Sequence, residues 1–213
     1  MSSRLFVGQV AIITGAGQGI GFEIARQLCL NGASAILNDV DAALAQHAAA
    51  AIEKQGGICH AMTGDAADVT FINQMTDEAV KRFGGITIAI ANAGITLFGD
   101  FFEYKQDALQ RVMNVNLGGS FFLAQAAGIQ MKKQGGGGSI LLMSSVTGHQ
   151  AHPKTNILRM LTNNFRRSQH YFIPIAHILM EYYTCSLPPK LLHPHPANIH
   201  IFNNKQTSRK RLV

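Results

Sequence analysis

Glycine and proline are each missing from one part of this 213-residue chain. All 21 glycines lie at or before Gly148, and all 6 prolines lie at or after Pro153. At the average glycine content of roughly 7%, a stretch as long as the part after residue 150 would hold about four glycines. The absence of glycine from the tail after residue 150 therefore excludes a uniform composition, and the tail differs in composition from the part before it.

Charged residues are scarce as well, at 14% of the chain against 47% for hydrophobic residues. This composition excludes a disordered chain and a coiled coil. The net charge of +6 comes from the tail, because the first 150 residues carry −2 and the remainder carries +8. The basic residues of the tail, such as those at 209–211, show no amphipathic helical pattern with interleaved aromatic residues. We therefore expect no nucleic-acid partner.

Long apolar runs and paired cysteines are also lacking. No apolar run approaches the roughly 18 residues of a transmembrane helix, so we expect no membrane partner. Cys29, Cys59 and Cys185 stand at unrelated spacings without a C-x-x-C pair, which predicts reduced thiols in a cytoplasmic protein. His193 and His195 in the tail have no metal-ligand spacing, and we expect no metal site.

Within the first 150 residues, short apolar runs alternate with segments of helical periodicity. The predicted strands are residues 10–14, 33–38, 58–63, 86–91 and 139–144, and the predicted helices are residues 19–30, 42–55, 70–83 and 105–133. Strands that are apolar along their length are typical of a parallel sheet covered by helices on both faces. The pattern predicts an α/β fold with a doubly wound parallel sheet that ends after about the fifth strand.

A glycine-rich turn from Thr14 to Gly21 (T-G-A-G-Q-G-I-G) joins the first predicted strand to the first helix. Glycines adopt positive φ and let main-chain N–H groups approach a pyrophosphate at the positive end of a helix. The next strand is followed by Asp39, where a carboxylate would bind the ribose of adenosine. Asp39 alternatively caps the following helix, although Asp41 is equally placed for that role. The turn and Asp39 together predict a Rossmann-like dinucleotide site, and the carboxylate favours NAD(H) over NADP(H) because it would repel a 2′-phosphate.

The spacing of the turn resembles the T-G-x-x-x-G-x-G turn of the classical short-chain dehydrogenases/reductases. Further motifs match that family in order, namely Gly64-Asp65, Asn92-Ala93-Gly94, Asn116-Leu117-Gly118 and Ser144-Ser145. Bacterial 3-oxoacyl-carrier-protein reductases and glucose or sugar-alcohol dehydrogenases look nearest. The resemblance implies cofactor contacts from Gly15, Gln18, Gly19, Ile20, Gly21, Asp39, Asp65, Ala66, Asn92, Ala93 and Gly94.

The resemblance also implies an NAD(P)-dependent oxidoreductase that transfers hydride between the nicotinamide and a small carbonyl or alcohol substrate. Ser145 would polarise the substrate oxygen, and Asn116 would hold a water in the proton relay. Ser145 alternatively caps the next element, and Asn116 alternatively kinks its helix. Asn114 competes with Asn116, and the family's V-N-L-x-G pattern selects Asn116. Members of the family usually form homo-oligomers through two long helices, of which residues 105–133 would be the first.

The catalytic Tyr and Lys of the family are missing. They are expected at 158 and 162, where this chain has Leu158 and Thr162, and no Tyr-x-x-x-Lys pair occurs anywhere in the sequence. The resemblance ends near Asn156, which predicts a dinucleotide-binding domain over 1–156 and a divergent basic tail over 157–213. The tail is either the product of a frameshift, mis-splicing or truncation, or a selected sequence. The chain is accordingly an active enzyme, a catalytically inactive dinucleotide-binding remnant or a product that does not fold, and the motifs do not select a substrate.

Overall fold

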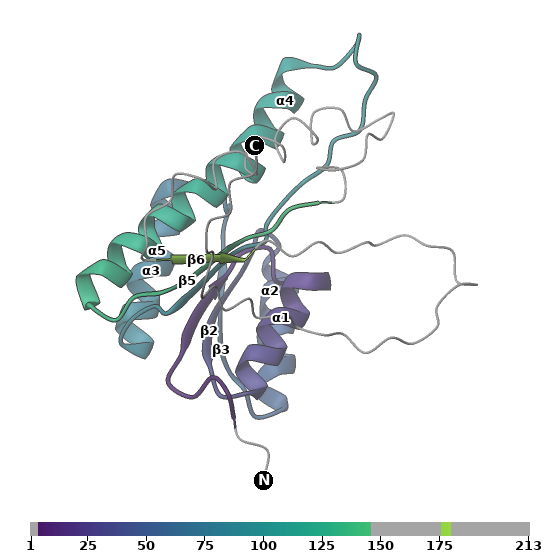
Figure 1. The fold of residues 1–213 in the computed structure, drawn as a ribbon. Coiled ribbons are helices and arrows are strands. Elements are labelled where there is room, and N and C mark those ends of the chain that lie inside the picture. Colours follow the sequence, from purple (N-terminus) through teal and green to yellow (C-terminus); the bar gives the residue numbers. More distant parts are fainter. Residues whose placement is uncertain (1–3, 146–175, 180–213) are drawn as a thin grey trace, which may run out of the picture. The chain divides into compact units, whose positions relative to one another are not determined.

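The computed structural model describes residues 4–145 and the strand at 176–179. In chain order the elements are β1 (Val10–Ile13), α1 (Gly19–Leu30), β2 (Ser34–Asp39), α2 (Ala42–Lys54), β3 (Ile58–Thr63), α3 (Val69–Phe83), β4 (Ile88–Ala91), α4 (Gln106–Val112), the π-helix η1 (Met113–Gly119), α5 (Ser120–Gln134), β5 (Gly138–Leu142) and β6 (Ala176–Leu179). The strands pair in parallel in the order β3-β2-β1-β4-β5-β6. Figure 1 shows the sheet with helices packed beside it. The predicted α/β fold with a doubly wound, Rossmann-like sheet is confirmed.

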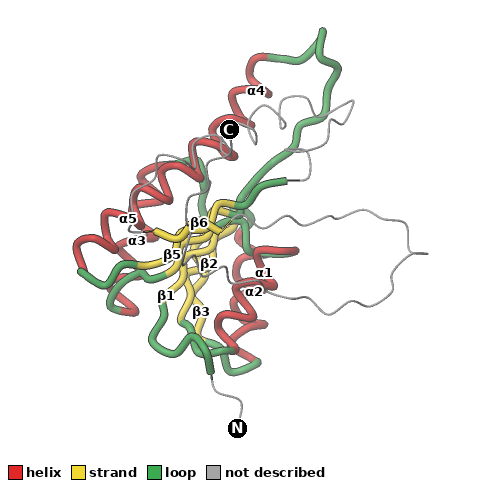
Figure 2. Tube along the Cα trace, viewed as in Figure 1, coloured by secondary structure: helices red, strands yellow, loops and turns green. Residues whose placement is uncertain are grey.

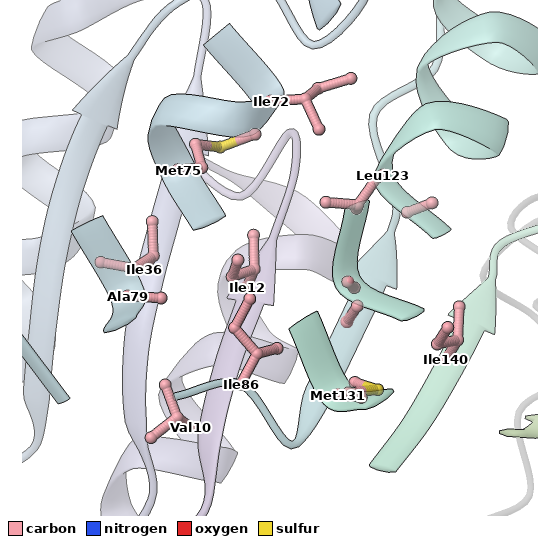
Figure 3. Close-up of a cluster of buried hydrophobic side chains, with 13 residues drawn as sticks. Val10, Ile12, Ile36, Ile72, Met75, Ala79, Ile86, Leu123, Met131 and Ile140 are labelled. Carbon is pink, nitrogen blue, oxygen red and sulfur yellow. The ribbon is translucent and has the colours of Figure 1, made fainter. Parts of the chain in front are cut away.

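Helices cover both faces of the sheet, as the apolar strands predict. Helices α1 and α2 lie on one face, and α3 and α5 lie on the other (Figure 2). Along β1 the side chains alternate, so that Val10 and Ile12 pack in the cluster with α3 and α5, whereas Ala11 and Ile13 pack in the cluster with α1 and α2. Figure 3 shows the first of these clusters. Burial on both faces explains why the strand carries no polar residue.

The ends of two helices follow from local side-chain chemistry. Asp41 caps α2, because its carboxylate accepts hydrogen bonds from the main-chain nitrogens of Ala43 and Leu44 at 2.8 and 3.0 Å. Asp68 caps α3 in the same way through Thr70, at 2.8 Å. Since Asp41 supplies the cap of α2, Asp39 is left for another role.

The helix predicted over residues 105–133 is divided into three segments, which corrects the sequence interpretation. A seven-residue π-helix, η1, separates α4 from α5. Apolar periodicity does not distinguish an i→i+5 turn from an i→i+4 turn, so the sequence pattern could not show it. At the end of η1, a Cβ on Gly119 would lie 2.5 Å from the carbonyl oxygen of Ala66, so glycine allows the helix to approach the loop after β3.

The sheet also continues one strand beyond the predicted five. Strand β6 pairs in parallel with β5, from Gly138 opposite Ala176 to Leu141 opposite Leu179. An edge strand leaves a row of unpaired main-chain groups, and a segment of the tail pairs with that row here. The sheet of the described residues therefore has six strands, and the prediction that the family fold is truncated after about the fifth strand stays a prediction.

The described residues belong to one compact unit, which spans Met1–Tyr183. The predicted boundary near Asn156 lies outside the described residues and stays a prediction. Among the helices that the structure describes, none is long and apolar enough to cross a membrane.

Candidate functional site

The carboxyl ends of the parallel strands meet at one edge of the sheet, where the strand order reverses between β1 and β4. In open α/β sheets, ligands bind at this position. A cavity of about 600 Å³ lies there. Of the residues predicted to contact a cofactor, those lining the cavity are Gly15, Gln18, Asp39, Asp65, Ala66, Asn92, Ala93 and Gly94. The structure thus brings together residues from the ends of four strands.

The glycine turn passes very close to the segment after β4. Gly15 has a φ of +61°, and a Cβ there would lie 2.8 Å from the Cα of Ala93. At Gly21, in the first turn of α1, a Cβ would lie 2.4 Å from Nδ2 of Asn92 and 2.6 Å from the carbonyl oxygen of Gly15. Gly19 has a φ of +62° but no atom near its Cβ position. Glycine at 15 and 21 is therefore required for packing, whereas glycine at 19 is required only for conformation.

Asn92 and Thr14 hold the turn in place. The Asn92 amide donates hydrogen bonds to the carbonyl oxygens of Thr14 and Gly15 at 3.0 and 2.9 Å. The hydroxyl of Thr14, which is buried, accepts hydrogen bonds from the main-chain nitrogens of Asn92 and Ala93, both at 3.1 Å. These bonds join segments almost eighty residues apart, so Asn92 acts as a positioning residue for the turn.

Asp39 connects β2 to the same turn. Its Oδ2 accepts a hydrogen bond from the nitrogen of Gly17 at 2.9 Å, and its Oδ1 accepts one from the nitrogen of Asp41 at 3.1 Å. A Cβ on Gly17 would lie 2.7 Å from Oδ2, so a side chain at 17 would displace the carboxylate. Each carboxylate oxygen has about two lone pairs and accepts one of these bonds, which leaves acceptor capacity on both oxygens.

The loop after β3 is positioned by Asn38 and Asp65. The amide of Asn38, which is 1% exposed, donates to the carbonyl oxygens of Met62 and Gly64 at 3.2 and 2.9 Å. Oδ1 of Asp65 accepts a hydrogen bond from the nitrogen of Ala67 at 2.8 Å. Asn38 was missed by the sequence interpretation, although a polar residue at the end of an apolar strand was the signal for it.

Asn116 holds the segment that follows the Asn92-Ala93-Gly94 motif. Its Oδ1 accepts a hydrogen bond from the nitrogen of Ile95 at 2.8 Å, and its Nδ2 donates one to the oxygen of the same residue at 2.9 Å. The main-chain oxygen of Asn116 accepts a hydrogen bond from the hydroxyl of Ser120, also at 2.8 Å. Asn116 therefore ties η1 to a residue of the cavity wall, and the helix at this point is π-helical.

Asn114 has a different environment from Asn116. Asn114 lines the cavity, together with Asp107, Gln110, Arg111 and Val115 from the same helical stretch. This wall was missed by the sequence interpretation, because periodicity alone does not tell which face of a helix meets a cavity. The remaining lining residues that were missed are Asn38, Val40, Gly64, Ala67 and Ile95.

Other predicted residues lie near this edge without lining the cavity. Gly19, Ile20 and Gly21 form the start of α1 and are not among the described residues of the cavity wall. Ser145 lies three residues after the end of β5, and the residue has an interaction partner. The positions of Leu158 and Thr162 lie outside the described residues.

The cavity lining holds four charged residues, and the described part of the chain has no cluster of metal ligands. The described lining includes three carboxylates, those of Asp39, Asp65 and Asp107, and the guanidinium of Arg111. Within residues 4–145, no three His, Cys, Asp or Glu side chains gather as a metal site would require. The histidines of the tail lie outside the described residues.

Comparison with known proteins places this site in a family. A model of the short chain dehydrogenase family matches residues 9–157. A short-chain dehydrogenase/reductase of Armillaria gallica is 39% identical over 154 residues, covering 71% of this chain and 59% of the relative. An L-rhamnose 1-dehydrogenase (NAD(P)(+)) of a Sphingomonas species is 37% identical over 145 residues, covering 68% of this chain and 57% of the relative.

A solved structure agrees with these relatives. The crystal structure of a short-chain type dehydrogenase/reductase from Mycobacterium marinum superposes with a TM-score of 0.73 at 28% identity, covering 78% of this chain and 68% of that one. The chain thus spans little more than half the length of the two curated relatives, and the matched part carries the glycine turn and the motifs after β3, β4 and β5. Because the family model matches most of this chain, the chain belongs to the short chain dehydrogenase family.

Proposed function

We propose that this chain binds NAD(H) in preference to NADP(H) and, as an oxidoreductase, supports hydride transfer between the nicotinamide and a small carbonyl or alcohol substrate. The observation that carries the proposal is the meeting of Asp39 with the glycine turn at the cavity. A carboxylate bonded to Gly17 lies beside the main-chain groups that would face a pyrophosphate. The ribose and the phosphates of an adenosine diphosphate would therefore each find a partner at one cavity, the ribose at Asp39 and the phosphates at the glycine turn.

The residues present fit a dinucleotide. Gly15 lines the cavity and has no room for a Cβ, so main-chain atoms rather than a side chain would meet the phosphates there. The remaining acceptor capacity of Asp39 suits two ribose hydroxyls, while its negative charge disfavours a 2′-phosphate. When bound, the nicotinamide ring supplies or accepts the hydride.

Two residues of this chain would act near the substrate. Ser145 would donate a hydrogen bond from its hydroxyl to the substrate oxygen. The amide of Asn116 already makes two bonds to Ile95, so we propose it as a positioning residue that retains one N–H for a water. Its main-chain oxygen accepts a hydrogen bond from the hydroxyl of Ser120, which fixes the position of Asn116 in the helix.

An inactive dinucleotide-binding protein is the second candidate, and one specific observation favours it. The chain has no Tyr-x-x-x-Lys pair to supply the proton. A positioned general acid or base contributes roughly 10²- to 10⁴-fold in rate. Turnover without that pair would depend on the hydroxyl of Ser145 and on water.

One titration distinguishes these functions. NADH is titrated into the full chain by nicotinamide fluorescence, and nicotinamide absorbance is followed with a panel of ketones and alcohols. Binding with turnover supports the enzyme and excludes the inactive protein, whereas binding without turnover supports the inactive protein. A folded chain that binds neither NADH nor NADPH would refute both.

Asp39→Ala tests the assignment of the ribose contact. Loss of charge-assisted hydrogen bonds, worth about 1.5–3 kcal/mol, predicts a Kd for NADH raised about tenfold or more and a weaker preference against NADPH. Asp68→Ala is the matched control, since it removes a helix cap that does not line the cavity. Equal Kd values for wild type and Asp39→Ala with both nucleotides would contradict the assignment.

A further inference from the structure

Two cysteines that are far apart in the sequence meet in the core. Cys29 lies in the last turn of α1, and Cys59 is the second residue of β3. Both are buried in the apolar cluster on the α1 and α2 face of the sheet, with exposed fractions of 4% and 5%. Neither lines the cavity among the described residues, because α1 runs from the glycine turn towards the opposite edge of the sheet. The pair is therefore separate from the proposed dinucleotide site.

The start of β3 runs directly against Cys29. Sγ of Cys29 donates a hydrogen bond at 3.2 Å to the carbonyl oxygen of Ile58, the neighbour of Cys59. A Cβ on Gly57 would lie 2.9 Å from the Cβ of Cys29, so glycine at this position lets the chain approach α1 closely. The two residues before Cys59 thus fix the contact that brings the thiols together.

The two thiols affect each other's protonation. A hydrogen bond with Cys59 lowers the pKa of Cys29, although burial acts in the opposite direction. The same hydrogen bond, followed by burial, raises the pKa of Cys59. Because the thiolate is the form that reacts with oxidants, Cys29 is the nucleophile of the pair and Cys59 stays a thiol beside it.

The pair lies at a border of the sheet rather than at its centre. β3 is the outermost strand of the described sheet, and Ile58 is 57% exposed. Elements with few covering contacts open locally at a lower free energy than the centre of a core. A small uncharged oxidant therefore needs only a local opening of this edge to reach the sulfurs.

We propose that Cys29 and Cys59 are a redox-active thiol pair, which hydrogen peroxide converts into a disulfide between α1 and β3. The sulfur of Cys29 attacks the peroxide, the O–O bond breaks, and Cys29 becomes a sulfenic acid as one water leaves. The sulfur of Cys59 then attacks the sulfur of Cys29, the S–O bond breaks, and a second water leaves as the S–S bond forms. The two thiols together lose two electrons and two protons, and one peroxide is reduced to two waters.

A plain structural alternative exists for the same two residues. Free cysteines are often buried as small apolar side chains without any redox role. On that alternative, peroxide leaves both thiols unchanged in the folded protein. The two possibilities therefore differ in a product that mass spectrometry detects.

The experiment treats the folded full chain with hydrogen peroxide, blocks the remaining thiols and digests the protein without a reductant. Trypsin cleaves after Arg26, Lys54 and Lys81, so the two cysteines fall in different peptides and a disulfide joins these peptides. We expect the linked peptide, and we expect dithiothreitol to separate it again. A crosslink that closes a loop of about 30 residues should also raise the thermal midpoint by about 5–15 °C, as followed by circular dichroism.

Three variants test the partners and the order of the steps. Cys185→Ser is the matched control, since it removes the third cysteine, which lies outside the described residues, and it should form the same link. Cys59→Ala should stop at a sulfenic acid on Cys29, which dimedone traps. Cys29→Ala should give no sulfenic acid on Cys59, and a trapped acid there would overturn the assignment of the nucleophile.

The linked peptide of the wild type decides the proposal even if an alanine variant is unfolded, because it requires no substitution. Peroxide treatment that leaves both thiols free would overturn the redox pair. A link of either residue to Cys185, or a link between Cys29 and Cys59 that forms only in urea, would overturn it equally. None of these results bears on NADH binding, so the failure of this proposal and the failure of the proposed function are distinguishable.

Discussion

Gly21 lies in the first turn of α1, where alanine would ordinarily improve a helix. Its Cβ position, however, is 2.6 Å from the carbonyl oxygen of Gly15 and 2.4 Å from Nδ2 of Asn92. The oxygen belongs to the main chain and has no freedom to move aside. We predict that Gly21→Ala destabilises the protein by forcing the glycine turn away from Asn92.

The magnitude follows from three contributions. Overpacking costs about 1–3 kcal/mol. Displacement of the Asn92 amide weakens its two hydrogen bonds to Thr14 and Gly15, at about 1 kcal/mol each. The higher helix propensity of alanine stabilises the variant by at most about 1 kcal/mol. The free energy of unfolding should therefore fall by about 2–4 kcal/mol, and the thermal midpoint by about 4–16 °C.

Gly128→Ala provides a control with the same chemical change. Gly128 lies within α5, and its Cβ position has only Cδ1 of Ile140 nearby, at 3.9 Å, which is an ordinary contact. Helix propensity alone then predicts stabilisation by about 1 kcal/mol. Both variants are measured by urea unfolding followed by circular dichroism. A Gly21→Ala variant as stable as Gly128→Ala would refute the packing of the turn.

Three further substitutions test the site and the sheet. Thr14→Val keeps the side-chain shape but leaves the N–H of Ala93 without its acceptor and the N–H of Asn92 with the carbonyl oxygen of Ile90 alone, so urea unfolding should show a loss of about 1–3 kcal/mol; an unchanged stability would mean that the buried hydroxyl is not their acceptor. Asn116→Leu removes both hydrogen bonds to Ile95 and should lower the free energy of unfolding by about 1–2 kcal/mol and weaken NADH binding. A loss of stability with unchanged NADH affinity would show that Asn116 does not position the cavity wall for the nucleotide. Burial, followed by the nearby Arg82, lowers the pKa of His60, so the unfolded state binds the proton more strongly. Stability should therefore fall as pH drops below about 6.5, and His60→Gln should flatten that decline; an identical decline in the variant would assign it to other groups.

Much of the fold could be predicted from the sequence because its signals are local. The uninterrupted apolar run of β1 predicts a strand covered on both faces, and Asp41 predicts the start of α2. The glycine turn could be located for the same reason, since positive φ at Gly15 and Gly19 depends on the residue itself. The family also follows from these motifs, in their order along the chain.

Other features are outside the reach of local patterns. The sequence predicts one helix over 105–133, but the structure contains a π-helical segment in which Asn116 bonds to Ile95, far away in the sequence. The pairing of β6 with β5 depends on an edge that the other strands of the sheet leave open. The roles of Asn114 and Asn116 could not be separated from their neighbours in sequence. The structure separates them, because one faces the cavity and the other bonds to the main chain after β4.

The sequence by itself determined the α/β alternation, the dinucleotide-binding turn, the family and the absence of a Tyr-x-x-x-Lys pair. Only the tertiary structure decided how Asp39 and Asn92 hold the turn, and which face of α4 closes the cavity. The reason is physical. Turn conformation and strand burial are encoded in neighbouring residues, whereas a cavity wall is set by the register of segments that lie far apart in the chain and meet only when the sheet has formed.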